Sequence, residues 1–280
     1  MDLNKRIESY LQESSPLLNN ALLHELVDMK WADLIENSNI KSPDNYSTAN
    51  VLLKENLPLA ELEEMSKGIF IEIPDFMHLS SFYKEHGLQP ISKHECDVIN
   101  AIKQLRNAFD FLCYENACRE NIEFLVKCIQ VLRQPEPEFD ISYSHPQVPF
   151  TIFVSIGHER SKNDTIRLAE SILHETMHLK LTIIEQFCPM VNDNNYHFFS
   201  PWRDEERPVQ GVLHGMYVFK TILDFYESVL PLVEDIEQYD FIDWRIESIK
   251  SEFKALKSFP SNIGLSANGA ILARNLLPSN

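Results

Sequence analysis

The stretch Asn163–Phe187 reads NDTIRLAESILHETMHLKLTIIEQF, and it decides how the chain is interpreted. Asparagine and aspartate side chains accept hydrogen bonds from the first N–H groups of a helix, so Asn163 or Asp164 can begin one here. Apolar residues follow at helical spacing, namely Ala169, Ile172, Leu173, Leu179 and Ile183. Directly before it, Phe150–Ile156 (FTIFVSI) is rich in β-branched and aromatic residues, as strands are. The sequence therefore predicts a long helix ending near Phe187, with a small strand element directly before it.

The rest of the chain also has a mainly helical pattern. Only seven of the 280 residues are glycine, which favours helices with short connections over a large β-sandwich. Helical spacing covers residues 3–35, 51–67, 92–132, 208–230 and 234–257, whereas Gly68–Pro74 and 141–144 are typical of short strands. We expect a mainly α fold of the α+β type. A helical region over 1–140 and a second region over 141–280, which contains the long helix, are expected to form one compact unit.

The charge and the cysteines restrict the expected partners and compartment. The formal net charge of −17 repels phosphate backbones and anionic lipid, whereas a basic or neutral peptide is electrostatically easier to bind. No run of eighteen apolar residues occurs, and Met1–Asn19 mixes charged with apolar residues, unlike a signal peptide. Five cysteines without a CxxC pair fit reduced thiols better than a disulfide framework or a cysteine-rich zinc site. We expect a cytoplasmic protein that binds neither nucleic acid nor membrane; the sequence does not set its oligomeric state.

Inside the long helix stands HETMH, a motif of the HExxH type, at residues 174–178. Residues four apart share one helical face with Cβ atoms about 5–6 Å apart, so His174 and His178 can offer ring nitrogens to one metal ion. Glu175 is displaced around the helix, where its carboxylate can orient or deprotonate a bound water. This makes the helix zincin-like, and its apolar neighbours predict a partly dry pocket. The alternative is a pair of surface or hydrogen-bonded core histidines.

A third ligand is expected downstream, because two imidazoles alone hold a metal weakly. Metzincins have a glycine three residues after the second histidine and another histidine three residues later; Leu181 and Ile184 stand there and exclude that subclass. His214 is the strongest candidate, since it lies on the next predicted helix between Gly211 and Gly215, and glycines permit a close approach of two helices. The alternative for His214 is an ordinary interhelical histidine. Rival ligands are Glu205, Glu206 and Glu227.

The segment Ser200–Pro208 (SPWRDEERP) places two arginines just before the helix that carries His214. An arginine guanidinium binds a carboxylate through two parallel hydrogen bonds. Arg203 and Arg207 are therefore candidates for binding a carboxylate group of a ligand. Salt bridges with the neighbouring acidic residues explain the two arginines equally well.

These motifs together resemble those of the HExxH-motif proteins found with gene clusters for ribosomally synthesised, post-translationally modified peptides. The resemblance rests on Leu173–His178 (LHETMH) and on Ser142–Ser144 (SYS) with the strand that ends at Ile156. A second signature, SPWR…RPxxGxxHG, adds Ser200–Arg203, Arg207, Pro208, Gly211, His214 and Gly215, with Phe219 and Gly264–Leu272 after it. The resemblance covers about the last half of the chain, and no motif of the first 130 or so residues matches.

The resemblance implies an enzyme that uses iron(II) and 2-oxoglutarate to hydroxylate a side-chain carbon, typically Cβ, of a ribosomally made precursor peptide. His174, His178 and His214 would hold the iron and leave three octahedral positions for the cosubstrate and oxygen. A third histidine departs from the two-histidine, one-carboxylate triad that is usual for this chemistry, which leaves the metal open.

The resemblance also implies roles for two arginines, for Glu175 and for the N-terminal region. Arg203 or Arg207 would pair with the carboxylate of 2-oxoglutarate that lies far from the metal. Glu175 would hydrogen-bond a ligand histidine or orient water or peptide, and would not necessarily act as a base. The helical region 1–140 would bind the leader part of the peptide or complete the core.

Two other functions remain open at this point. In a zinc metallopeptidase, Glu175 would activate a water on the metal, and the third ligand would be a carboxylate from the 205–227 stretch. An extended substrate would then pair with the strand Phe150–Ile156 by edge addition. In a non-catalytic peptide-binding protein the histidines would be structural and no metal would bind.

Overall fold

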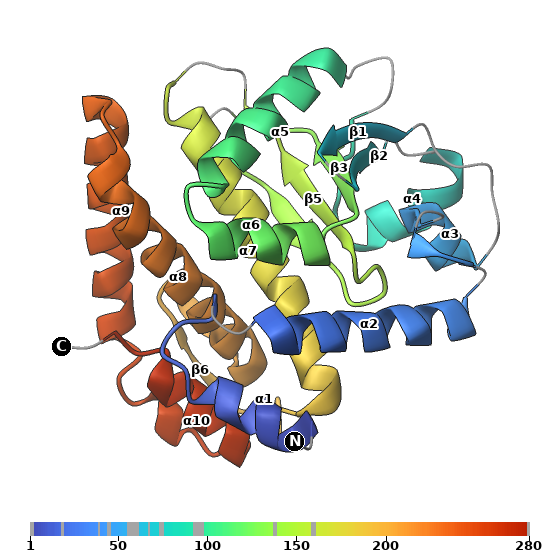
Figure 1. The fold of residues 1–280 in the computed structure, drawn as a ribbon. Helices are drawn as coiled ribbons and strands as arrows, with labels where there is room; N and C mark the ends of the chain where they lie inside the picture. The colour runs from blue at the N-terminus through green and yellow to red at the C-terminus, as the bar shows by residue number, and fades with distance from the viewer. Residues whose placement is uncertain are drawn as a thin grey trace. The chain divides into compact units, whose positions relative to one another are not determined.

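The computed structural model describes residues 3–17, 20–38, 40–43, 46–54, 62–66, 68–72, 76–91, 98–136, 139–157 and 161–278. Helices predominate, and a small mixed sheet accompanies them, so the predicted mainly α fold of the α+β type is confirmed (Figure 1). The chain forms two compact units, His24–Leu179 and Met1–Leu23 with Lys180–Asn280. The predicted division at residues 140 and 141 stays a prediction. No helix in the described part of the chain is long and apolar enough to cross a membrane.

The unit His24–Leu179 is built on a five-stranded sheet with the strand order β1-β2-β3-β5-β4. Its strands are β1 (Leu62–Ser66), β2 (Ile69–Glu72), β3 (Cys128–Leu132), β4 (Ser142–Ser144) and β5 (Thr151–Ser155). The three central strands run parallel, whereas β1 and β4 are antiparallel to their neighbours at the two edges. All residues of β3 and β5 are buried, as expected for central strands covered on both faces.

Two of the predicted helices contain strands, and these predictions are wrong there. Leu62–Ser66 is β1, although helical spacing covered 51–67, and Cys128–Leu132 is β3, although it covered 92–132. A short apolar run such as CIQVL fits both periodicities, so only its neighbours in the sheet decide. The predicted strands near Gly68–Pro74, 141–144 and 150–156 are confirmed as β2, β4 and β5. Residues 55–61, 67, 73–74 and 92–97 of these predictions lie outside the described residues.

Helices accompany the sheet within the same unit. They are α3 (Thr48–Leu53), α4 (Phe76–Glu85), α5 (Val98–Leu112) and α6 (Asn116–Leu125), while α2 (Asn20–Asn37) crosses the border of the unit. The buried Glu72 of β2 joins α3 to β3, since it accepts hydrogen bonds from Thr48 N at 3.0 Å and Gln130 Nε2 at 2.9 Å. Burial raises the pKa of the Glu72 carboxyl, and these hydrogen bonds oppose that rise.

Helix α7 (Asp164–Phe187) confirms the predicted long helix that ends near Phe187. The Asn163 carbonyl accepts from Arg167 N at 2.9 Å, so the helix begins where a capping residue was expected. Its buried residues include Ile166, Ala169, Leu173 and Met177, which recur at helical spacing. The part up to Leu179, which contains HETMH, belongs to the unit with the sheet, and the remaining turns belong to the other unit.

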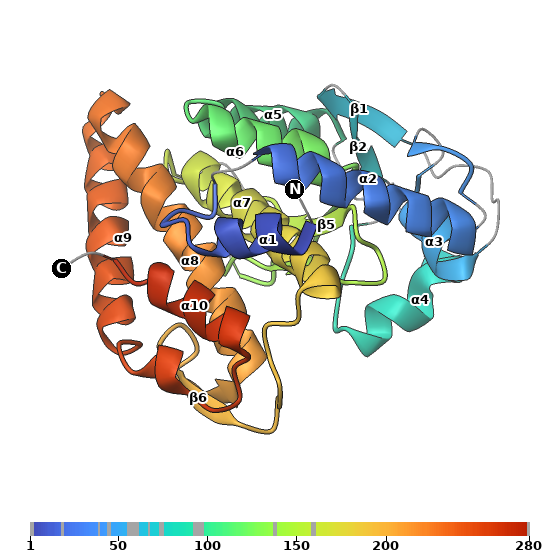
Figure 2. The ribbon, with the colours of Figure 1, turned by 60° about the horizontal axis from the view of Figure 1, so that its bottom comes forward.

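The other unit combines the N-terminal helix with the C-terminal third of the chain. It contains α1 (Leu3–Leu11), the hairpin of β6 (His197–Ser200) and β7 (Glu205–Pro208), α8 (Val209–Val229), the 3-10 helix η2 (Leu230–Leu232), α9 (Ile236–Lys254), η3 (Phe259–Ser261) and α10 (Ala267–Asn275). Helices α8 and α9 were predicted, whereas the hairpin and α10 were not. Figure 2 shows α1 beside α10, where Asn275 Nδ2 donates to Leu11 O at 2.9 Å.

Candidate metal centre on helix α7

His174 and His178 meet on α7 as their four-residue spacing predicts. Their Nε2 atoms are 3.1 Å apart, and the ring centroids are separated by 4.8 Å. Both residues are half-buried, while Leu173, Met177 and Leu179 beside them are buried. Two nitrogens bound at right angles to one metal, each at about 2.1 Å, would lie about 3.0 Å apart. The pair therefore fits two ligands of a single metal ion, and it fits an N–H···N hydrogen bond between neutral rings equally well.

Glu175 is buried, with 3% of its surface exposed, and both of its oxygens are held. Ser142 Oγ donates to Oε1 at 2.6 Å, and Ser144 Oγ donates to Oε2 at 2.7 Å. The two serines are two residues apart on β4, so their side chains share one face of the strand. Glu175 Oε1 also lies 3.9 Å from His174 Nε2. Ser142 and Ser144, which belong to the motif SYS of the family resemblance, thus fix the direction of the carboxylate.

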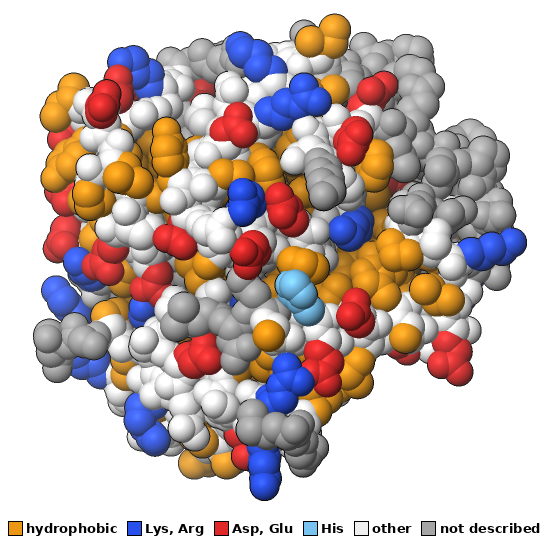
Figure 3. All heavy atoms as spheres, in the orientation of Figure 1, with side chains coloured by type: hydrophobic (Ala, Val, Ile, Leu, Met, Phe, Trp, Pro, Cys, Tyr) orange, Lys and Arg blue, Asp and Glu red, His pale blue; other side chains and the backbone are white. Residues whose placement is uncertain are grey.

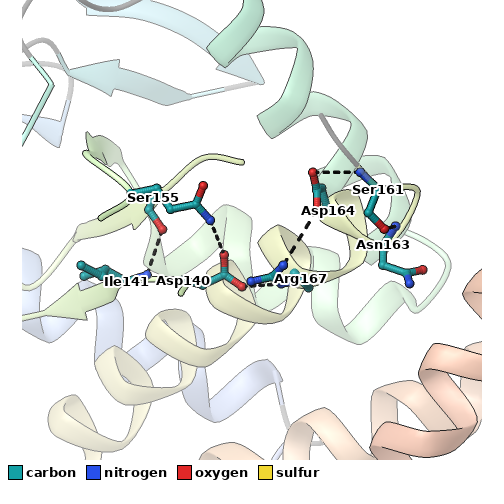
Figure 4. Close-up of polar contacts among 8 residues, drawn as sticks. Asp140, Ile141, Ser155, Ser161, Asn163, Asp164 and Arg167 are labelled. Carbon is teal, nitrogen blue, oxygen red and sulfur yellow. Dashed lines mark hydrogen bonds and ion pairs between the residues drawn. The ribbon is translucent and has the colours of Figure 1, made fainter. Parts of the chain in front are cut away.

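A second connection joins β4 to α7 at the start of the strand (Figure 4). Asp140 Oδ2 accepts from Arg167 Nε at 2.8 Å, and Ile141 N donates to Ser155 Oγ on β5 at 2.8 Å. Burial raises the pKa of the Asp140 carboxyl, although the Arg167 guanidinium opposes the rise. Helix α7 therefore contacts this strand segment twice, through Arg167 and, two turns later, through Glu175.

The opposite face of β4 carries an aromatic and imidazole cluster that the sequence did not predict. The Tyr143 hydroxyl is 2.9 Å from His86 Nδ1, and the His86 and His145 ring centroids are 4.5 Å apart. Burial and the neighbouring His86 lower the pKa of His145. The alternation of a strand would have placed Tyr143 opposite the serines, but no local signal connects it to His86, which is 57 residues away.

His214, the predicted third ligand, lies on α8 in the other unit and contacts a carboxylate. Its Nε2 is 3.0 Å from Glu185 Oε2, which also accepts from Gln210 Nε2 at 3.1 Å. Glu185, which lies on the last turns of α7, was not singled out from the sequence. Among the described residues, no three or more His, Cys, Asp and Glu side chains form a group arranged to hold a metal. The structure thus brings together His174 with His178, and His214 with Glu185.

The two glycines around His214 differ in what they permit. A Cβ at Gly215 would lie 2.6 Å from the Trp202 ring, so only glycine admits the indole there. Trp202 in turn stacks on Phe219 with centroids 4.7 Å apart. At Gly211 the nearest atom is Arg207 Nε at 4.0 Å, which is ordinary contact. We expected two helices to approach closely at these glycines. The close approach occurs at Gly215 alone, and it is made by the side chain of Trp202.

Both candidate arginines lie on the hairpin of β6 and β7. Arg203, in the connecting turn, is exposed and makes no ion pair with the described residues. Arg207 Nη1 is 2.9 Å from Glu205 Oε1, and both side chains are well exposed. Salt bridging, one of the two explanations drawn from the sequence, is thus observed at Arg207, and exposed pairs of this kind stabilise a fold by at most about 1 kcal/mol.

The rival carboxylate ligands also lie in this unit. Glu205 takes part in that exposed ion pair, Glu206 is exposed on β7, and Glu227 pairs with Lys250 at 2.9 Å. Each environment is that of a surface carboxylate.

No protein-family model matches this chain, and no curated protein matches it.

Proposed function

We propose that this protein is an iron(II)- and 2-oxoglutarate-dependent hydroxylase that acts on a side-chain carbon, Cβ, of a ribosomally made precursor peptide. The proposal rests on the hydrogen bonds that Ser142 and Ser144 donate to Glu175. This carboxylate lies beside the paired imidazoles of His174 and His178. Bound iron(II) with 2-oxoglutarate would supply the activation of molecular oxygen, which is the oxidant, and 2-oxoglutarate would be oxidised together with the peptide carbon. The chain supplies the imidazoles, a fixed carboxylate and a surface for the peptide.

The fixed carboxylate is what separates this proposal from hydrolysis. A zinc metallopeptidase needs a glutamate that takes a proton from the attacking water. Both oxygens of Glu175 already accept a serine hydroxyl, at 2.6 and 2.7 Å, in a buried position. A carboxylate held in this way is suited to orienting a bound water or the peptide beside the histidines. Its Oε1 lies 3.9 Å from His174 Nε2, beyond hydrogen-bond distance.

The remaining ligands of the proposal come from the second sequence signature. His214 serves as the third imidazole, and Arg203 or Arg207 pairs with the far carboxylate of 2-oxoglutarate. The exposed Arg203 makes no ion pair among the described residues, so it can bind such a carboxylate without giving up an existing ion pair. Arg207 would have to exchange its contact with Glu205.

An extended peptide would bind at the edge of the sheet, but not at the strand expected from the sequence. The strand in Phe150–Ile156 is β5, which lies between β3 and β4, so edge addition to it is excluded. The edge strand is β4. Ser155 N donates to Ile141 O, so by antiparallel alternation Tyr143 directs its backbone groups toward β5, and Ser142 and Ser144 direct theirs outward. A peptide added there would pair with the two residues that hold Glu175.

The zinc metallopeptidase is the second candidate, because the histidine pair and the β4 edge suit it as well. A non-catalytic peptide-binding protein is the third, since a hydrogen bond between His174 and His178 needs no metal.

We further propose a cytoplasmic location without nucleic-acid or membrane partners. This rests on the net charge of −17, and the described cysteines Cys113, Cys118, Cys128 and Cys188 form no disulfide.

The test is anaerobic titration of the metal-free chain with iron(II), followed by 2-oxoglutarate, while visible absorption is recorded. We expect the weak charge-transfer band of the chelate in the natural chain and in His197→Ala, a control on the exposed strand β6. The band should be absent in His174→Ala and should need more 2-oxoglutarate in Arg203→Ala. No band, together with peptide cleavage by the zinc-loaded chain, would establish the peptidase instead, and no metal binding at all would leave the binding protein.

A further inference from the structure

Helix α9 has an exposed apolar face in addition to the face that it buries. Its inner row, Ile242, Ile246, Ile249 and Phe253, is buried and faces the core that α9 shares with α8. On the outside, Leu232 just before the helix is 57% exposed, Ile236 is 72% exposed and Trp244 is 61% exposed. Single exposed apolar residues are common, whereas several large ones on one surface mark an interaction site.

The outer residues are aligned by the helical period. Ile236, Asp240 and Trp244 are four residues apart, so they form one row about 12 Å long. Phe241 widens the row at its far end, where its ring centroid is 5.9 Å from that of Trp244. The row thus alternates an aliphatic side chain, a carboxylate and an aromatic pair.

Acidic side chains surround these apolar positions. From Leu232 to Glu247, both included, the sequence has six acidic residues and one basic residue, Arg245. Arg245 points inward, since its guanidinium lies 5.4 Å from the centroid of the Phe219 ring and only 16% of its side chain is exposed. Asp240 and Asp243 are exposed and form no ion pair within the described part of the chain. Figure 3 shows hydrophobic and acidic side chains side by side in the region where Figure 1 draws α9.

We propose that this acidic apolar face, defined by Leu232, Ile236, Asp240, Asp243 and Trp244, binds a basic amphipathic peptide segment of a partner protein. Apolar side chains of the segment would pack on Trp244 and Ile236, and lysines or arginines would pair with Asp240 and Asp243. Tryptophan is enriched among the residues that carry most of the free energy of binding at interfaces. The inference involves no residue of the proposed metal site and does not depend on the proposed function.

The charge of the face selects this partner over the alternatives. In a two-fold dimer the same patch would meet itself, which would bring two acidic faces of like charge together. Phosphate backbones and anionic lipid headgroups have the same sign as the face and are repelled. A cationic segment is attracted to it, and its apolar side chains cover the exposed tryptophan.

The experiment is fluorescence anisotropy of a labelled Leu/Lys amphipathic peptide, about five helical turns long, titrated with the full chain. A second peptide with glutamate in place of lysine serves as the charge control. We expect the basic peptide to bind and the acidic peptide not to bind. Trp244→Ala should weaken the affinity for the basic peptide about tenfold or more, and the double variant Asp240→Lys, Asp243→Lys should abolish its binding. Controls on α5 match both changes: Ile99→Ala removes an apolar residue that is 82% exposed, and Asp110→Lys reverses an exposed acid.

Three results would overturn the proposal. The first is equal binding of the two peptides, and the second is a loss in Ile99→Ala or Asp110→Lys as large as in the α9 variants. The third is self-association of the chain, measured by sedimentation, that disappears in Trp244→Ala, because the face would then belong to a second copy. Trp244→Phe keeps an aromatic ring and should retain binding, which separates loss of the contact from loss of the fold.

Discussion

Two histidine environments in this chain differ in what their contacts leave for a metal. His174 Nε2 faces another imidazole nitrogen, that of His178, at 3.1 Å, whereas His214 Nε2 faces a carboxylate oxygen of Glu185 at 3.0 Å. A histidine–carboxylate contact is complete as a hydrogen bond. Two facing imidazole nitrogens instead share one proton or one cation. The contact of the α7 pair fits either a hydrogen bond or a shared metal ion, whereas a ligand role for His214 through Nε2 requires that its contact with Glu185 be exchanged.

Which nitrogen of His214 could bind a metal depends on the tautomer of its ring. If Nε2 donates its proton to Glu185, the lone pair of the neutral ring is at Nδ1, and Nδ1 is the nitrogen that can bind a metal. If Nε2 binds the metal, the contact with Glu185 is lost. In the proposed centre His174 and His178 would bind through Nε2, the atoms that face each other. The predictions below test this difference between the two environments.

The largest expected effect is the loss of metal on removing a histidine of the pair. We expect His174→Ala to weaken metal affinity by more than about 100-fold, beyond the 10–100-fold that is typical when only a group behind a ligand is changed. Calorimetry with cobalt(II) or zinc(II) measures it, and the exposed His197→Ala is the control. Unchanged affinity in His174→Ala would assign the 3.1 Å contact to a hydrogen bond and remove the proposed centre.

The second prediction concerns the serines that make the α7 site different from the His214 site. Ser144→Ala should destabilise the chain by about 1–3 kcal/mol, because it leaves a buried carboxylate oxygen of Glu175 without its donor. Urea unfolding gives the change in free energy. In a Glu175→Gln background the same substitution should cost less, and a double-mutant cycle measures the coupling. Equal costs in both backgrounds would show that the contact does not hold Glu175.

The third prediction examines the carboxylate behind His214. If His214 is a ligand through Nδ1, Glu185→Gln should weaken metal affinity about tenfold, because Glu185 fixes the tautomer and orientation of the ring. Titration of the metal-free variants in parallel with His214→Ala measures this. Should both variants bind metal as the natural chain does, His214 is an ordinary interhelical histidine and a carboxylate becomes the candidate third ligand.

The sequence predicted the parts of this arrangement that depend on local spacing. The start and end of α7, the pairing of His174 with His178 and the strand of Ser142–Ser144 follow from helical and strand periods within one element. The partners of Glu175 and His214 do not, since Ser144 and Glu185 are 31 and 29 residues away from them. Strand β3 was mistaken for helix because burial on both faces removes the alternation that marks a strand. Local patterns therefore located the candidate site, and only the packing of distant segments showed how its side chains are held.

The smallest effect comes from a third histidine environment, the His86–His145 pair on the opposite face of β4. The groups around His145 are His86, Glu85 and the Tyr143 hydroxyl; burial and His86 lower its pKa below 6.5, while Glu85 opposes this. Because the folded state binds the proton less readily than the unfolded state, stability is present above pH 6.5 and is lost as pH falls through the lowered folded-state pKa. His145→Gln should flatten the dependence of the unfolding free energy on pH between about 7 and 5, whereas the exposed His197→Gln should not. A steeper dependence in His145→Gln would mean that the protonated ring is stabilised in the folded protein, contrary to the lowered pKa.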